Sequence, residues 1–146
     1  MTEGLACDQS APGEKGKNNE CDVVMRALDK NLFSWTDYGD SQGATWNPSR
    51  EQQEKWARSY AQAIAGTPIN MTFSPQTKDF EFCFSLDLAI DMPTEIFASL
   101  TYSYNVTRRI STSSNIKVQD EDTDIVYIIP TRSATQGSTA CVRISR

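Results

Sequence analysis

Histidine is absent from this chain of 146 residues, and its absence excludes several kinds of catalytic site. Serine and cysteine triads with an imidazole base, HExxH zinc sites and histidine proton shuttles all need this side chain. Proton transfer and nucleophilic attack would therefore depend mainly on carboxylates, with lysine and tyrosine as further options.

A surplus of basic residues and a long apolar run are also absent. The formal net charge is −5 and the pI is about 4.7, so the chain lacks the basic stripe of a nucleic-acid-binding protein. We therefore expect no nucleic-acid partner. No apolar run approaches the ~18 residues that span a membrane as a helix. The first ten residues lack the basic and apolar regions of a secretory signal.

Four cysteines are present, and none has the CxxC spacing of a zinc or redox site. Cys7 and Cys21 flank a loop that contains glycine and proline, and a local disulfide there is favoured over two free thiols. Cys83 and Cys141 fall in predicted strands, where both a disulfide and free buried cysteines fit the pattern. The pairing of all four therefore stays open.

Acceptor motifs for N-glycosylation occur at Asn70-Met71-Thr72 and at Asn105-Val106-Thr107. Asn70 and Asn105 are therefore candidate glycosylation sites. Together with paired cysteines, these motifs favour a secreted or lysosomal protein whose signal lies outside this sequence.

Helical periodicity marks the first part of the chain. An amphipathic helix is predicted over residues 20–30, with its apolar stripe formed by Val23, Val24, Ala27 and Leu28. A strand is predicted over residues 32–38 and a second helix over residues 47–60. Residues 59–66 either extend that helix or form a connector.

Period-two alternation replaces the helical pattern after Pro68, most clearly from Phe80 to Leu86. Strand-sized runs separated by turn residues follow one another, and residues 75–79 are a predicted hairpin loop. Such spacing is typical of an antiparallel β-sandwich, with a boundary near Gly66. The predicted strands are Ile69–Ser74, Phe80–Asp87, Thr94–Leu100, Asn115–Gln119, Ile125–Pro130 and Ala140–Ser145.

Several stretches resemble family 5 glycoside hydrolases of the endoglycoceramidase group. They are Thr2–Cys7, Leu32–Tyr38, Arg58–Pro68, Phe80–Phe84 and Pro93–Phe97, and Arg58–Pro68 is the most specific. The resemblance covers roughly residues 1 to 100. It implies an α+β fragment, in which residues 1–66 are the last strand and helix elements of a catalytic (β/α)8 barrel. Residues 67–146 would form the antiparallel β-sandwich behind it.

The same resemblance implies a glycosidase site. Glu3 matches the nucleophile of the family, and Trp35 matches an aromatic residue that lines the sugar subsite. The family cleaves the bond between oligosaccharide and ceramide in glycosphingolipids. A glycolipid or oligosaccharide substrate is therefore implied, with contact to a membrane surface through its lipid. No cofactor, metal or protein partner is inferred, and the acidic run Asp120–Asp124 is expected to be a solvated turn.

The acid/base glutamate of the family lies earlier in the barrel and has no counterpart in this sequence. Retaining hydrolysis needs two carboxyl groups about 5 Å apart, and the match supplies only Glu3. We therefore expect the C-terminal piece of a longer enzyme, inactive by itself. Two alternatives remain. One is a non-catalytic β-sandwich module that stabilises a barrel or binds sugar or lipid, and the other is an adhesion-type sandwich, which would explain residues 67–146 only.

Overall fold

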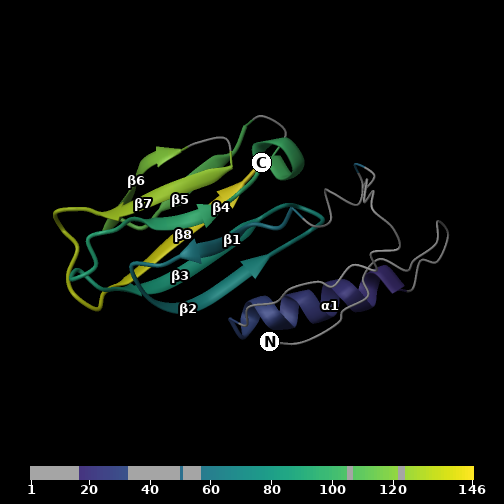
Figure 1. Cartoon of the computed structure of the whole chain (residues 1–146), viewed down its shortest axis with the longest axis horizontal. Coiled ribbons are helices and arrows are strands. Elements are labelled where there is room, and N and C mark those ends of the chain that lie inside the picture. The colour runs from purple at the N-terminus through teal and green to yellow at the C-terminus, as the bar shows by residue number, and fades with distance from the viewer. Residues whose placement is uncertain (1–16, 33–49, 51–56, 105–106, 122–123) are drawn as a thin grey trace, which may run out of the picture.

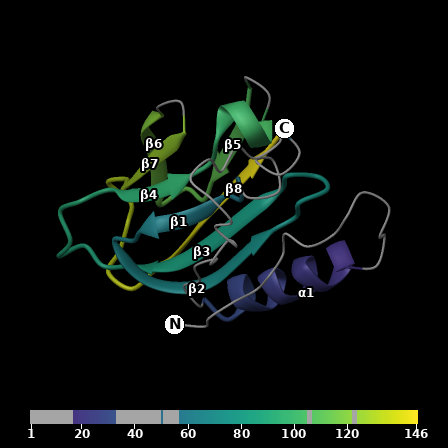
Figure 2. The ribbon, with the colours of Figure 1, turned by 45° about the vertical axis from the view of Figure 1, so that its right-hand side comes forward.

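The computed structural model describes residues 17–32, 50, 57–104, 107–121 and 124–146. In these ranges a helix, α1 (Lys17–Lys30), lies beside two four-stranded antiparallel sheets that pack face to face (Figures 1 and 2). No helix in these ranges is long and apolar enough to cross a membrane. The β-sandwich predicted from the alternating pattern is therefore confirmed. The barrel predicted for residues 1–66 falls largely on residues outside the described ranges.

Each sheet combines one pair of consecutive strands with two strands from other parts of the sequence. The first has the order β1-β4-β7-β6, and the second has the order β2-β3-β8-β5. The strands of the first sheet are β1 (Tyr60–Ala63), β4 (Thr94–Phe97), β7 (Ile125–Pro130) and β6 (Ile116–Glu121). Those of the second are β2 (Gly66–Phe73), β3 (Phe80–Leu86), β8 (Thr139–Ser145) and β5 (Arg109–Thr112).

The core lies between the two sheets and follows the period-two pattern. Phe82 and Phe84 of β3 and Val142 of β8 point inward and are almost fully buried. Ile96 and Val126 meet them from the other sheet. Burial of one such side chain stabilises the fold by roughly 1.5–3 kcal/mol. The residues between them in β3 and β8 form the outer face of the second sheet.

Six predicted strands correspond to β2, β3, β4, β6, β7 and β8. The predicted hairpin loop is also confirmed, because the backbone N–H of Ser74 donates to the carbonyl of Asp79 at 2.9 Å. β4 is shorter than predicted and ends at Phe97. The chain then forms a π-helical turn, η1 (Leu100–Tyr104), in which the N–H of Tyr104 donates to the Ser99 carbonyl at 3.2 Å.

Two strands were not predicted. β1 and β5 are four residues long, lie at sheet edges and show no clear apolar alternation, so periodicity gave no signal. The prediction for residues 59–66 was wrong, because Tyr60 begins β1 and Gly66 begins β2. Tyr60 pairs with Phe97 of β4, so the sandwich includes residues before Gly66. A Cβ at Gly66 would overlap the Ser85 carbonyl, so only glycine fits there.

The predicted helix is confirmed as α1, but its apolar stripe is only partly correct, because Val24 and Leu28 are half-buried whereas Ala27 is exposed. Among the α1 residues whose burial the structure describes, Met25 and Asp29 are the buried ones, at 3% and 5% exposure, whereas Val23 is 65% exposed. α1 packs against β2, and the i, i+4 spacing places Met25 and Asp29 together on the packed face. Periodicity missed this face because one of its two buried members is charged.

Candidate functional site

A buried ion pair joins α1 to the start of the sandwich. Nη2 of Arg58 donates to Oδ2 of Asp29 at 2.5 Å, and both side chains are almost fully buried. The guanidinium carbon of Arg58 also lies 5.1 Å from the centre of the Phe73 ring in β2. One cation thus contacts the helix and a strand at once. We call Asp29, Arg58, Ser59, Phe73 and Tyr104 the helix–sandwich joint.

Burial has the largest effect on the pKa of the Asp29 carboxyl. Desolvation raises the pKa of this carboxyl, and the attraction and hydrogen bond of Arg58 act in the opposite direction. Nε of Arg58 is buried and has no hydrogen-bond partner among the described residues. The ion pair therefore leaves one buried N–H without a hydrogen bond, which lowers its net contribution to stability.

The other side of the joint is held by hydroxyl groups. Ser59 Oγ and the Tyr104 hydroxyl share a hydrogen bond of 2.9 Å, and Ser103 Oγ donates to the Ala57 carbonyl. Burial is the main cause that raises the pKa of Tyr104 to about 12, so its hydroxyl stays protonated at neutral pH. Residues 57–59 are thus fixed between α1 and η1.

A groove of about 770 Å³ runs from α1 across the outer face of the second sheet. Both charge signs line it: Arg26, Lys30, Arg109 and Arg143 face Asp29, Asp79 and Glu81. Arg143 Nε and Glu81 Oε2 form an ion pair of 2.9 Å across β3 and β8. Such a surface can hydrogen-bond a polar ligand. The described residues contain no cluster of His, Cys, Asp or Glu that could hold a metal ion.

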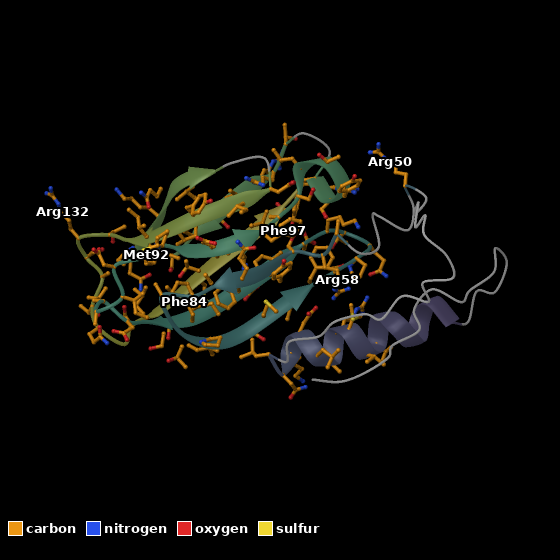
Figure 3. All side chains as sticks on the ribbon, in the orientation of Figure 1. Arg50, Arg58, Phe84, Met92, Phe97 and Arg132 are labelled. Atoms are coloured by element: carbon orange, nitrogen blue, oxygen red, sulfur yellow. A yellow bond between two sulfur atoms is a disulfide. The ribbon has the colours of Figure 1, made fainter. Side chains whose placement is uncertain are left out.

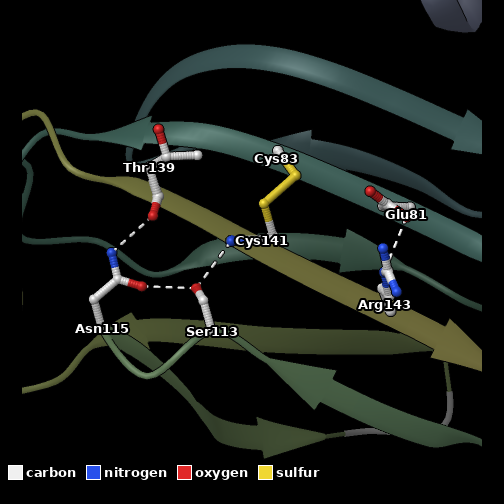
Figure 4. Close-up of a disulfide and its surroundings, with 7 residues drawn as sticks. All are labelled: Glu81, Cys83, Ser113, Asn115, Thr139, Cys141 and Arg143. Atoms are coloured by element: carbon white, nitrogen blue, oxygen red, sulfur yellow. Dashed lines mark hydrogen bonds and ion pairs between the residues drawn. A yellow bond between two sulfur atoms is a disulfide. The ribbon is translucent and has the colours of Figure 1, made fainter.

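A disulfide joins Cys83 of β3 to Cys141 of β8 on the same outer face (Figure 4). The two residues are direct partners in the strand register, with Cα atoms 4.2 Å apart. Ser113 Oγ accepts a hydrogen bond from the Cys141 backbone N–H and donates one to Asn115 Oδ1. Of the two alternatives for these cysteines, the disulfide is therefore confirmed, and the free buried pair is excluded.

Most of the other predicted site residues lie outside the part of the chain that the structure describes. Glu3, Trp35, Cys7 and Asn105 lie outside the described residues. Cys21 lies in α1, but the structure does not describe its side chain. Asn70 lies in β2, half-buried and on the outer face. The roles proposed for Glu3 and Trp35 therefore stay predictions.

The joint was missed by sequence reasoning, although one signal for it was available. The segment Arg58–Pro68 was identified as the most specific part of the family resemblance, but no role was assigned to Arg58. Asp29, four residues after Met25, gave no sign of burial in the sequence, because charged residues on helices are mostly exposed. The partner itself lies 29 residues away and could not be chosen from spacing.

Comparison with known families and structures gives two findings. The model of the glycoside hydrolase family 5 C-terminal domain matches residues 58–144. The fold also matches structures of endo-glycoceramidase II from Rhodococcus sp., among them its ganglioside GM3 complex and its lactosyl-enzyme intermediate. The TM-score is 0.66 at 16% identity, over 89% of this chain for the first and 91% for the second.

At this identity the likeness establishes a shared fold. This chain covers 28% and 30% of those two chains, so it spans less than a third of their length. The comparison with curated proteins finds no match.

Proposed function

This chain belongs to the family of glycoside hydrolase family 5 C-terminal domains, and we propose that it is the C-terminal part of a retaining enzyme that cleaves the oligosaccharide–ceramide bond of glycosphingolipid-like substrates. One observation carries the proposal. The fold match covers 89–91% of the chain and so extends into the residues before 58, beyond the matched domain. This extent supports the proposal that the sandwich and part of the segment before it have the arrangement found in endo-glycoceramidase II.

The helix–sandwich joint supports a common role for the sandwich and the segment that contains α1. Arg58, at the first position of the matched domain, is paired with Asp29 of the preceding helix. In the sequence, Glu3 precedes α1 and Trp35 follows it. A helix fixed on the sandwich would hold the ends of the segments that contain them in a constant position, which catalysis requires of its positioning elements.

The proposed chemistry is a double displacement. The Glu3 carboxylate attacks the anomeric carbon, the bond to the ceramide oxygen breaks, and a covalent glycosyl-enzyme forms that water then hydrolyses. A lactosyl-enzyme intermediate has been captured for endo-glycoceramidase II, which is the species that this mechanism requires. Trp35 would pack its ring against the apolar face of the sugar. A second carboxyl group, from another part of the enzyme, would protonate the leaving oxygen.

A secreted or lysosomal location is part of this proposal. The Cys83–Cys141 disulfide is compatible with an extracellular protein, because such bonds persist in oxidising compartments.

Trapping of the intermediate tests the role of Glu3 directly. The longest natural protein that contains this chain is incubated with an activated 2-deoxy-2-fluoro-lactoside, and the labelled peptide is identified by mass spectrometry. We expect the label on the peptide that contains Glu3, and a loss of glycolipid hydrolysis of roughly 10³-fold or more in Glu3→Gln. Glu14→Gln, in the same segment, is the matched control and should keep full activity. A label on a different carboxylate would refute the assignment.

A second candidate function, a module that binds a lipid surface, is favoured by the loop between β3 and β4. Leu88, Ile90 and Met92 are 43%, 39% and 67% exposed, so three large apolar side chains gather within five residues. Gln136 holds the loop, because its Oε1 accepts from the Leu88 N–H and its Nε2 donates to Asp87 Oδ1. Figure 3 shows Met92 far from Arg58, at the other end of the sandwich.

The charges near this loop indicate which lipid surface it would meet. Asp87 and Asp91 lie in the loop, and such charges are repelled by anionic lipids. We therefore assign it to a zwitterionic lipid surface. In co-sedimentation with phosphatidylcholine vesicles, the triple variant Leu88→Ser, Ile90→Ser, Met92→Ser should lose most binding, whereas the exposed Val23→Ser on α1 should keep it. Equal binding of both variants would refute the lipid-binding module and leave the hydrolase proposal untouched.

A further inference from the structure

We propose that Asn70 carries an N-linked oligosaccharide, and that this glycan covers the outer face of the second sheet beside the disulfide. Asn70 and Thr72 of the acceptor motif are the partners of Cys83 and Glu81 in the register of β2 and β3. Paired residues in a sheet share a face, so both functional side chains of the motif point outward. Met71 between them pairs with the fully buried Phe82 and points toward the core.

The side chain of Asn70 is available for modification. It is half-buried, and no hydrogen bond or other side-chain interaction of Asn70 is found with the described residues. Thr72 is exposed, and Ile69, the residue before Asn70, is 51% exposed. β2 is an edge strand, so the face is open on one side. An attached sugar at this position would displace no core contact.

The disulfide is an independent observation that points to the same chemistry. Cys83 is the register partner of Asn70 and is bonded to Cys141. Disulfide formation requires an oxidising compartment, and in the eukaryotic secretory pathway this is also where sequons are glycosylated. Motif and disulfide therefore identify one surface that is exposed during folding in that compartment. The inference does not depend on the hydrolase activity proposed above.

The transfer follows from the chemistry of the amide. Nδ2 of Asn70 bonds to the anomeric carbon of an oligosaccharide donor that is linked to a lipid diphosphate. The bond from that carbon to the diphosphate breaks, and the diphosphate leaves with the electron pair. The amide gives up one proton to the transferase. No oxidant or reductant is needed, and the new link is an N-glycosidic bond.

The glycan has a structural consequence for the groove. Thr72 and Glu81 line this groove, and Asn70 lies two residues before Thr72 on the same face. A glycan on Asn70 would stand at the β2 side of the groove and above Cys83. A further protein domain could then not pack on the sheet around Cys83, whereas α1 already contacts β2 at the other side of the groove.

The experiment compares variants of the acceptor motif. The full chain is secreted from eukaryotic cells with a leader peptide, in an Asn105→Gln background that removes the other motif. Peptide-N-glycosidase F treatment should lower its apparent mass by one glycan and convert Asn70 to Asp in the peptide map. Thr72→Ser should keep the glycan. Thr72→Val, which has the same shape at an exposed site, and Asn70→Gln should lose it.

The conversion of Asn70 to Asp in these variants decides whether the proposal holds. A secreted protein with an intact Cys83–Cys141 disulfide that shows no conversion at Asn70, in the parent chain and in Thr72→Ser, would overturn the proposal. Conversion in the parent chain and in Thr72→Ser, with none in Thr72→Val, establishes it. Because Thr72→Ser and Thr72→Val differ only at an exposed position, a folding defect would not imitate this pattern.

Discussion

The sandwich core and the helix–sandwich joint are equally buried but are built from opposite chemistry. The core consists of apolar side chains, such as Phe82, Ile96 and Val126, with Tyr104 at its border. The joint holds a charged pair and a pair of hydroxyl groups, each matched to a specific partner. Apolar packing is non-directional and supplies most of the stability. Buried polar contacts have fixed geometry, so they define how parts are oriented.

This difference explains why a costly ion pair is present at all. Desolvation of two charges often cancels their attraction, and an apolar pair of similar volume can be as stable. Arg58 Nε lacks a hydrogen-bond partner among the described residues, which adds to that cost. We infer that Asp29 and Arg58 fix the position of α1 rather than add to the net stability. The comparison therefore predicts different effects for substitutions in the two regions.

The largest effect is expected in the core. Phe82→Ala removes a fully buried ring that stacks on Phe84 at 5.2 Å between centroids. We expect the free energy of unfolding to fall by about 4 kcal/mol, since large-to-small core substitutions add a cavity to the lost transfer energy. Urea denaturation followed by circular dichroism measures the change. Val23→Ala, at a 65% exposed position, should change it by less than about 0.5 kcal/mol.

A somewhat smaller effect is expected when the joint is broken on one side. Arg58→Met leaves the Asp29 carboxylate buried without its cation and should cost about 3 kcal/mol at neutral pH. Burial already raises the pKa of Asp29, and loss of Arg58 raises it further. The folded form then binds its proton more tightly than the unfolded form. The loss in free energy of unfolding caused by Arg58→Met should therefore become smaller as the pH falls below this raised pKa. The loss caused by Phe82→Ala should not depend on pH.

The double variant Asp29→Leu, Arg58→Met separates orientation from stability. We expect its free energy of unfolding to lie within about 1 kcal/mol of the parent chain, because no charge remains buried. Amide hydrogen exchange in α1 should nevertheless become faster than in the parent, as the directional contact is lost. Unchanged exchange in α1 would contradict the orienting role. A double variant as unstable as Arg58→Met would show that packing, not charge, holds the joint.

Tyr104, on the hydroxyl side of the joint, should make the free energy of unfolding depend on pH in the alkaline range. The folded pKa of Tyr104 is about 12, whereas an unfolded tyrosine has a pKa of 10.0. Above pH 10 the unfolded form loses this proton and the folded form keeps it. The contribution of this group to the free energy of unfolding is therefore fully present below pH 10. It decreases by about 2–3 kcal/mol as the pH rises from 10 to 12. Tyr104→Phe should remove this part of the alkaline slope in denaturation midpoints measured from pH 9 to 12.

Sequence predicted the core far better than the joint, for a physical reason. Alternating apolar residues identify a buried strand face locally, so the predicted strands Phe80–Asp87 and Ile125–Pro130 agree within a residue with β3 and β7. A buried ion pair has no local pattern, because Asp29 and Arg58 meet only after the chain has folded. The short edge strand β1 likewise depends on pairing with β4 rather than on its own pattern. The Cys83–Cys141 bond required the strand register, which spacing alone does not fix.

The smallest effect is expected for an ion pair of the same chemistry at the surface. Arg143 and Glu81 lie 2.9 Å apart across β8 and β3, but their side chains are 70% and 36% exposed, against 5% and 7% for Arg58 and Asp29. Water and salt screen the exposed pair, so the coupling energy from a double-mutant cycle with Arg143→Ala and Glu81→Ala should be about 0.2–1 kcal/mol. It should fall further when the salt concentration rises. The coupling between Asp29 and Arg58 should resist salt, because solvent does not reach that pair. Equal salt dependence in both cycles would show that the joint opens to water in solution, and the contrast between a screened and an unscreened pair would then be lost.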